Sequence, residues 1–195
     1  LRAQGDMLPE VTETYRAAAN PSSYAAHFAG VEVDTLTGLV CVRDYLAVHD
    51  IGRAINPMLV EGQIHGGVQI GIGYALYEDV DIDLKTGHMR GDRFSRYHLA
   101  NAPEMPPVDV LLVEKGEPTG PFGAKAVGEI ATIPVAAAVV NAVNHALGTS
   151  LSDLPLTPDR IIAALEELQV RAAADDVSDF EDIMKDLTFV RATRK

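Results

Sequence analysis

The sequence is poor in three features that mark common classes of protein. Cys41 is the only cysteine, so the chain forms no internal disulfide and cannot by itself hold an iron–sulfur cluster, which takes about four thiolates. Its 16 Lys and Arg are outnumbered by 28 Asp and Glu, and the net charge of −12 disfavours nucleic acid or an anionic membrane as a partner. The longest apolar stretch, 131–147, is interrupted by Pro134 and Asn141, so it falls short of the roughly 20 residues of a membrane span.

Motifs of hydrolytic enzymes are also missing. The sequence has no HExxH spacing and no GxSxG turn, which leaves zinc and serine hydrolases without support. Asp79, Asp81 and Asp83 resemble a calcium loop only in their alternation, because the central glycine and the terminal glutamate are absent. We therefore expect no metal ion bound directly by side chains of this chain. Ordinary contents of apolar residues (47%) and charged residues (23%) favour a globular protein, which we expect in the cytoplasm.

Apolar periodicity and turn residues predict both strands and helices. We predict a hairpin of strands 25–34 and 39–48, further strands at 80–84 and 108–114, and hence at least four strands. Asn56 followed by Pro57 predicts a helix start, with the helix running to about residue 77. Helices are also predicted at 134–147 and 157–173, and a capping box at Ser178 and Glu181 predicts a short final one. Mixed elements without strict alternation indicate an α+β fold, a layered domain with helices packed on a mixed or mainly antiparallel sheet.

Glycines are concentrated in two stretches. The first lies at 61–76 and reads EGQIHGGVQIGIGYAL. Each glycine in a helix interior costs about 1 kcal/mol relative to alanine, so something must approach this helix closely. The pattern leaves open whether a neighbouring element or a ligand makes that approach. The second stretch, at 120–129, reads GPFGAKAVGE and places Glu129 on a glycine-flanked loop before an alanine-rich helix. A catalytic base could lie there; the alternative is a carboxylate that only stabilises the helix dipole.

These two stretches, together with AVHDIGRAINP at 47–57 and LPLTP at 154–158, occur in the order typical of one family. The chain resembles the molybdenum hydroxylases, the group of xanthine dehydrogenase and aldehyde oxidase. The resemblance implies a molybdopterin-binding C-terminal lobe at 23–165, with 1–22 as a lead-in segment and 166–195 as an acidic helical appendage. Catalytic subunits of the family are several times longer, and the sequence begins with Leu1, so we expect the C-terminal part of such a subunit, inactive alone.

The resemblance also implies roles for individual residues. Glu129 becomes the general base at the molybdenum centre, and we expect a dry, glycine-walled pocket around it, where a carboxylate is a stronger base than in water. The cofactor is a molybdenum pyranopterin, as molybdopterin or its dinucleotide form. Backbone N–H groups on glycine-rich segments suit its phosphate and ring atoms. The cofactor-facing candidates are Gln63, Gly66, Gly67, Lys125, Ala126, Val127 and Gly128.

The histidines have two interpretations each. His49 and Asp50 are adjacent at the end of a predicted strand, where they could orient a neighbour, although local hydrogen bonding is the commoner explanation for such a pair. His65, within the glycine-rich helix, could face the cofactor or a partner chain.

Enzymes of the family add oxygen from water to an electron-poor carbon of a purine, another N-heterocycle or an aldehyde. The resemblance therefore implies this activity, with iron–sulfur clusters and FAD on partner domains or subunits and with the remaining molybdopterin-binding lobe as a further partner. A related enzyme acting on nicotinate, an aromatic acyl-CoA or carbon monoxide is an alternative. A non-catalytic scaffold or cofactor-carrying subunit is another, although an intact GAKAVGE sequence argues against it.

Overall fold

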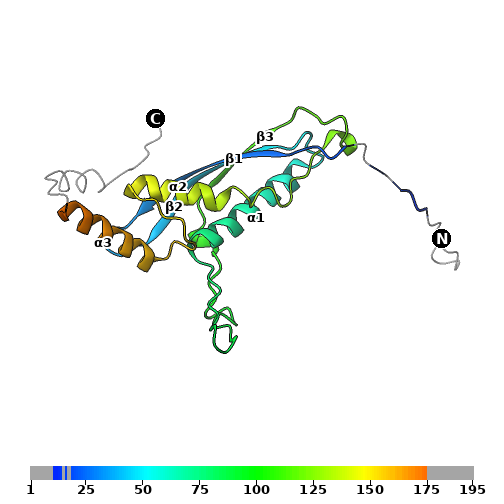
Figure 1. The fold of residues 1–195 in the computed structure, drawn as a ribbon. Helices are drawn as coiled ribbons and strands as arrows, with labels where there is room; N and C mark the ends of the chain where they lie inside the picture. The colour runs from blue at the N-terminus through cyan, green and yellow to red at the C-terminus, as the bar shows by residue number, and fades with distance from the viewer. Residues whose placement is uncertain (1–10, 15, 17–18, 175–195) are drawn as a thin grey trace.

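The protein is an α+β layered domain in which helices cover one face of a small sheet (Figure 1). The structure, a computed structural model, describes residues 11–14, 16 and 19–174. Its elements follow the order β1 (Tyr24–Val33), β2 (Val40–Asp50), α1 (Pro57–Leu76), β3 (Val108–Val113), α2 (Val135–Leu147) and α3 (Pro158–Ala174). Short 3-10 turns lie at Ala102–Glu104 and Pro121–Gly123. The predicted fold class is confirmed, whereas the helix predicted from Ser178 lies outside the described residues.

The sheet is mixed, with β2 in its centre. β1 and β2 form the predicted antiparallel hairpin, from Tyr24 opposite Asp50 to Val33 opposite Val40. β3 then pairs with β2 in parallel, from Tyr45 opposite Val108 onwards. Side chains alternate between the two faces, as the pleat requires. One face therefore carries the buried residues of β2 beneath the helices, and the other presents exposed aromatic residues such as Phe28.

Helix α1 begins where the sequence predicted it. The Asn56 side chain accepts a hydrogen bond from the Leu59 backbone N–H at 3.3 Å, and Pro57 occupies the first helical position. Helix α2 ends at Gly148, which adopts the left-handed conformation that suits a helix C-terminus. Only one face of α2 is fully buried, through the i, i+4 series Val135, Val139, Val143 and Leu147.

Two glycines of α1 allow α2 and its lead-in turn to pack closely. A Cβ atom on Gly67 would lie 2.6 Å from the Ala131 Cβ, and one on Gly71 would overlap the Val135 side chain. Ala131 and Val135 are fully buried in the core that joins α1, α2 and the sheet. Packing thus accounts for part of the glycine-rich sequence.

The predicted strand at 80–84 is wrong. Its alternating residues form a single isolated bridge, Ile82 to Met89, and no strand of the sheet. This segment belongs to an arm, defined here as residues 79–96, that leaves the body at the end of α1 (Figure 1). The described sheet therefore has three strands rather than at least four.

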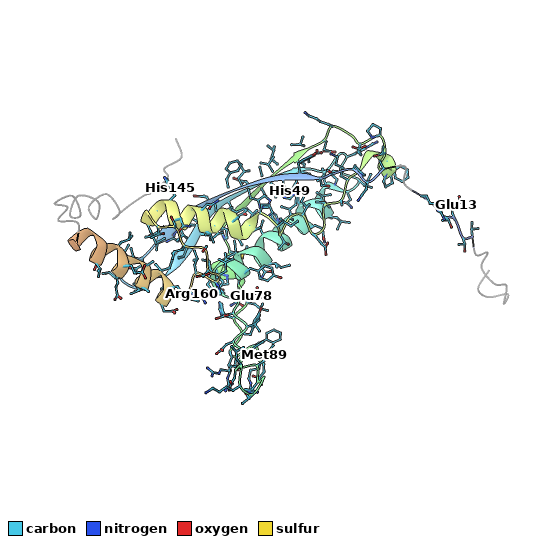
Figure 2. The ribbon with its side chains drawn as sticks, in the orientation of Figure 1. Glu13, His49, Glu78, Met89, His145 and Arg160 are labelled. Atoms are coloured by element: carbon cyan, nitrogen blue, oxygen red, sulfur yellow. The ribbon has the colours of Figure 1, made fainter. Side chains whose placement is uncertain are left out.

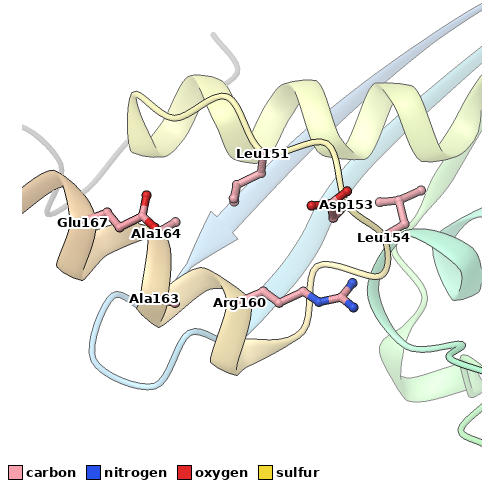
Figure 3. Close-up of a pocket in the computed structure, with 7 residues that line it drawn as sticks. All are labelled: Leu151, Asp153, Leu154, Arg160, Ala163, Ala164 and Glu167. Carbon is pink, nitrogen blue, oxygen red and sulfur yellow. The ribbon is translucent and has the colours of Figure 1, made fainter. Parts of the chain in front are cut away.

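Helix α3 is held to the body by its preceding loop. The Leu156 N–H donates to the Ala75 carbonyl at 2.7 Å, and the Arg160 guanidinium donates to the Pro155 carbonyl at 2.8 Å. A shallow hollow of about 460 Å³ lies between this loop and α3 (Figure 3). Of the helices that the structure describes, none combines the length and apolarity needed to cross a membrane.

Candidate functional site

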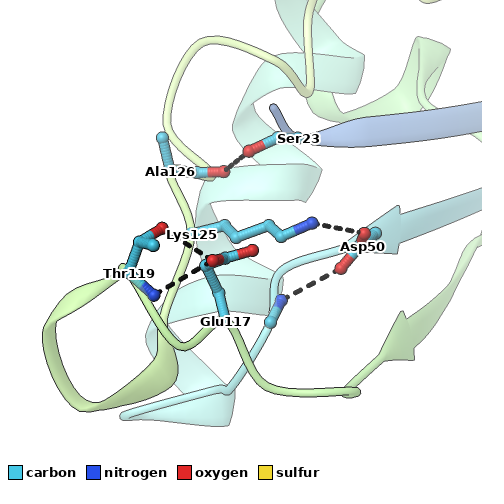
Figure 4. Close-up of polar contacts among 7 residues, drawn as sticks. Ser23, Asp50, Glu117, Thr119, Lys125 and Ala126 are labelled. Atoms are coloured by element: carbon cyan, nitrogen blue, oxygen red, sulfur yellow. Dashed lines mark hydrogen bonds and ion pairs between the residues drawn. The ribbon is translucent and has the colours of Figure 1, made fainter. Parts of the chain in front are cut away.

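The loop that carries Glu129 is fixed to the ends of two strands (Figure 4). The Lys125 ammonium donates to Asp50 Oδ2 at 2.7 Å, and the Lys125 backbone N–H donates to the Ile51 carbonyl at 2.8 Å. On the other side, Ser23 Oγ donates to the Ala126 carbonyl at 2.9 Å. Residues 125 and 126 are therefore positioned by the sheet and not by the loop itself.

The charges at this attachment reinforce one another. The hydrogen bond from Lys125 lowers the pKa of Asp50 and raises that of Lys125, so both groups stay ionised across the neutral range. The Gly52 N–H also donates to Asp50 Oδ1 at 3.1 Å, and the ammonium lies 5.5 Å from the centre of the Tyr24 ring. The Lys125 side chain and its backbone N–H thus both bind the protein itself.

Tight turns shape the first part of the loop. Gly123 has φ of +82°, and a Cβ on Gly52 would overlap the Gly123 carbonyl oxygen, so glycine is needed at both positions. Phe122 also has a positive φ, +55°, although its side chain is largely exposed. A hollow of about 460 Å³ is lined by residues of this turn, including Lys115, Glu117 and Phe122, but not by Glu129.

The last part of the loop lies against the open face of α1. A Cβ on Gly128 would lie 3.8 Å from the Gln63 Oε1, so these two predicted residues come together. On the same helix, a Cβ on Gly62 or Gly66 would meet no atom within 4 Å. These two glycines, unlike Gly67 and Gly71, have no packing explanation within the described chain. The surface of α1 at Gly62 and Gly66, called here the open strip, is therefore uncovered in the described chain, and Gln63 places it next to the loop that carries Glu129.

The other predicted site residues differ in how deeply they are buried. Gly67 is buried against Ala131, and Val127 packs on the edge of the core. Glu129 is exposed, and its side chain makes no hydrogen bond to any residue that the structure describes. Its backbone carbonyl accepts from the Thr132 N–H at 3.0 Å, which begins the turn into α2. Its carboxylate is thus exposed to solvent in the described chain.

A pair of histidines, the buried His49 and the half-buried His27, lies under the helices, and sequence reasoning missed it. His27 Nε2 lies 2.7 Å from His49 Nε2, and His27 Nδ1 lies 2.9 Å from the Tyr45 hydroxyl. Burial, with a smaller contribution from His49, lowers the pKa of His27 to about 4, and burial also lowers the pKa of His49. The hairpin register, which places Ala25 opposite His49, could have revealed the pair. Of the adjacent pair His49 and Asp50, Asp50 holds Lys125 and also accepts from the nearby Gly52 N–H, whereas His49 contacts His27.

Comparison with known proteins identifies the class to which this fold belongs. Residues 3–106 match the family described as molybdopterin cofactor-binding domain. The chain belongs to this family, and its relatives are subunits of molybdenum-dependent oxidoreductases.

Three relatives illustrate the range of that class. The chain is 42% identical over 142 residues to the putative xanthine dehydrogenase molybdenum-binding subunit of Escherichia coli K12, covering 73% of this chain and 19% of that protein. It is 37% identical over 158 residues to the nicotine 6-hydroxylase large subunit of Paenarthrobacter nicotinovorans, covering 80% of this chain and 19% of that protein. The crystal structure of quinoline 2-oxidoreductase from Pseudomonas putida 86 superposes with a TM-score of 0.67 at 38% identity, covering 70% of this chain and 18% of that one. The chain therefore spans about a fifth of the length of the relatives it matches.

Proposed function

We propose that this chain is the C-terminal cofactor-binding portion of the molybdenum-binding subunit of a molybdenum hydroxylase, with Glu129 as the general base. One arrangement supports the proposal above all. Glu129 ends a loop that the Asp50–Lys125 ion pair fixes to the sheet, and the neighbouring Gly128 lies beside Gln63 on the open face of α1. A base needs this combination of a fixed backbone and an accessible carboxylate.

The residues present fit a pyranopterin cofactor. Gly62 and Gly66 leave space where side chains would stand, and the adjacent Gln63 amide can both donate to and accept from polar ring atoms. The exposed residues Ala126 and Gly128 offer further backbone hydrogen-bonding groups from the loop, apart from the Ala126 carbonyl that accepts from Ser23. When bound, the cofactor supplies the redox centre at which oxygen from water is added to the substrate carbon. Gly67 and Val127 would support the cofactor site indirectly, because both pack against the core and not on the exposed surface.

Glu129 would accept the proton that water loses in this reaction. Because its side chain is exposed in this chain, the dry surroundings that strengthen a carboxylate base must come from another part of the subunit. Burial of Glu129 would then accompany assembly with that part, and partner subunits carrying iron–sulfur clusters and FAD would remove the electrons.

An electron-poor carbon of an N-heterocycle is the substrate site that we propose. The names of two relatives, nicotine 6-hydroxylase and quinoline 2-oxidoreductase, indicate such rings, and the E. coli relative extends the class to a purine. An aldehyde is the second candidate, because aldehyde oxidoreductases also match, at 34% identity.

Replacement of Glu129 by Gln in the assembled enzyme tests the proposal. Glutamine keeps the size of the side chain and removes the proton acceptor, so turnover should fall by about 10² or more while molybdenum content stays at the parent level. Glu166→Gln, at an exposed position of α3, is the control and should change neither quantity. Turnover within tenfold of the parent at full molybdenum loading would exclude Glu129 as the base. A native complex without molybdenum or pterin would instead favour the scaffold alternative.

A further inference from the structure

The arm at residues 79–96 has a rigid base. The Tyr97 hydroxyl donates to Glu78 Oε2 at 2.6 Å, and this hydrogen bond joins the two ends of the chain just outside the arm. The Tyr77 and His98 rings pack edge to face with centroids 5.0 Å apart. The Gln69 amide donates to the Ala100 carbonyl at 2.8 Å and ties the returning chain to α1. The arm therefore leaves the body in a fixed direction, from Glu78 at its base towards Met89 (Figure 2).

Beyond this base the arm is a hairpin held by its own backbone. Ile82 and Met89 form an antiparallel bridge, and the Gly87 N–H donates to the Asp83 carbonyl at 2.7 Å to close the turn. The Arg90 N–H donates to the Asp81 carbonyl at 2.8 Å. An isolated two-stranded hairpin is marginally stable in water, so this shape calls for a second surface against it.

The arm exposes several apolar side chains, which indicates that it contacts an apolar surface. Leu84 is 94% exposed and Phe94 is 84% exposed, so neither contributes to the core of this chain. Val80, Ile82 and Met89 are also exposed, at 41 to 51%. Single exposed apolar residues are common, but five on one projecting hairpin are typical of an interaction surface.

Charge also separates the arm from the rest of the chain. The arm contains four acidic residues (Asp79, Asp81, Asp83 and Asp92) and four basic residues (Lys85, Arg90, Arg93 and Arg96), so its net charge is zero, whereas the whole chain carries −12. Two copies of so acidic a chain repel each other, which disfavours self-association. A neutral arm with apolar tips suits a partner bound by burial of apolar surface.

We propose that this arm docks onto the part of a molybdenum-binding subunit that the relatives possess and this chain does not span. We choose this partner because the chain covers only 19% of the E. coli relative. The remaining part of such a subunit is long enough to cover the neutral, apolar hairpin that the fold leaves exposed. This assignment of the partner rests on the proposed function. Leu84 and Phe94 are the anchors of the contact. The contacts of Glu78 and Tyr97 hold the arm in place before binding, which reduces the conformational entropy lost when the partner binds.

Photo-crosslinking in the native complex tests the docking. A benzophenone amino acid replaces Phe94 in one preparation and Leu84 in another, and Leu36 serves as the matched control, since it is 90% exposed but lies on the β1–β2 turn. After irradiation, mass spectrometry identifies the linked peptide. We expect links from positions 94 and 84 to a polypeptide whose sequence aligns with the part of the E. coli relative that this chain does not cover. We expect none to that polypeptide from position 36.

A pair of charge variants provides the second measurement. The double variant Leu84→Glu, Phe94→Glu should lower the amount of that polypeptide copurifying with this chain by tenfold or more, and Leu36→Glu should leave it unchanged. Links to a second copy of this chain, or unchanged copurification of the double variant, would overturn the proposal. Molybdenum content separates this outcome from failure of the proposed function. A complex that crosslinks but lacks molybdenum would support the docking and contradict the cofactor role. A molybdenum-loaded complex without crosslinks would support the cofactor role and contradict the docking.

Discussion

Asp50 and Lys125 are 75 positions apart in the sequence, and their side chains meet at 2.7 Å. Asp50 is the last residue of β2, the central strand, and Lys125 lies four positions before Glu129. The central strand of the sheet therefore sets the position of the loop that carries the proposed base. Since Asp50 also accepts from the Gly52 N–H, its carboxylate is itself held in place.

We predict that Asp50→Asn lowers kcat in the assembled enzyme by about tenfold or more. The amide lacks the charge that anchors Lys125, and displacement of a catalytic group by about 1 Å costs up to 10² in rate. KM should change less than kcat, because Asp50 acts through Lys125 on the position of the loop that carries the proposed base. Asp50→Glu, which restores the charge with a longer side chain, should recover part of the loss.

Asp44→Asn is the matched control for this prediction, since Asp44 is an exposed aspartate on the same strand. It should leave kcat at the parent value. Equal losses from both substitutions, or a full loss of folding by circular dichroism in Asp50→Asn, would contradict a positioning role.

Local signals in the sequence predicted the elements well. Asn56 and Pro57 marked the start of α1, and the predicted helix at 134–147 ends where α2 does, because helix ends depend on neighbouring residues. The alternation at 80–84 failed because it describes a pleated segment without saying whether a neighbouring strand exists. The pairs Asp50–Lys125 and His27–His49 depend on tertiary packing, so neither followed from spacing. The roles of Glu129 and the cofactor-facing residues stay predictions.

The α1 glycines predict opposite effects of the same substitution. Gly67→Ala places a Cβ 2.6 Å from that of Ala131, so the free energy of unfolding should fall. Gly66→Ala meets no atom within 4 Å and should raise the free energy of unfolding of the cofactor-free chain by about 0.5–1 kcal/mol, as alanine is the better helix former. Urea denaturation of the two variants measures both changes.

The molybdenum content of variants in α1 tests whether the open strip binds the cofactor. If the open strip holds the pyranopterin, a larger side chain in Gly66→Leu should reduce molybdenum content in the assembled enzyme while the fold stays intact. Gly87→Leu is unsuitable as a control because Gly87 has a positive φ; Ala137→Leu, on an exposed face of α2, is suitable. Full molybdenum loading of Gly66→Leu would remove this part of α1 from the cofactor site.

The histidine pair predicts how stability depends on pH. The folded pKa of His27 is about 4 and its ordinary value is 6.5, so between these values the unfolded chain binds more protons than the folded one. The contribution of neutral His27 is therefore complete above pH 6.5 and is lost as the pH falls towards 4. His49 acts in the same direction, and the Tyr45 hydroxyl, whose pKa burial raises, does not titrate in this window.

The urea midpoint should therefore be lower at pH 5 than at pH 7, and His27→Gln should reduce that difference even if it destabilises the protein at both pH values. His145→Gln, at an exposed position of α2, should keep the parental difference. Most carboxylates titrate below this window, so they leave the comparison between pH 5 and 7 largely to the histidines. An unchanged pH dependence in His27→Gln would mean that a charged His27 is tolerated beneath the helices, contrary to its burial against His49 and Tyr45.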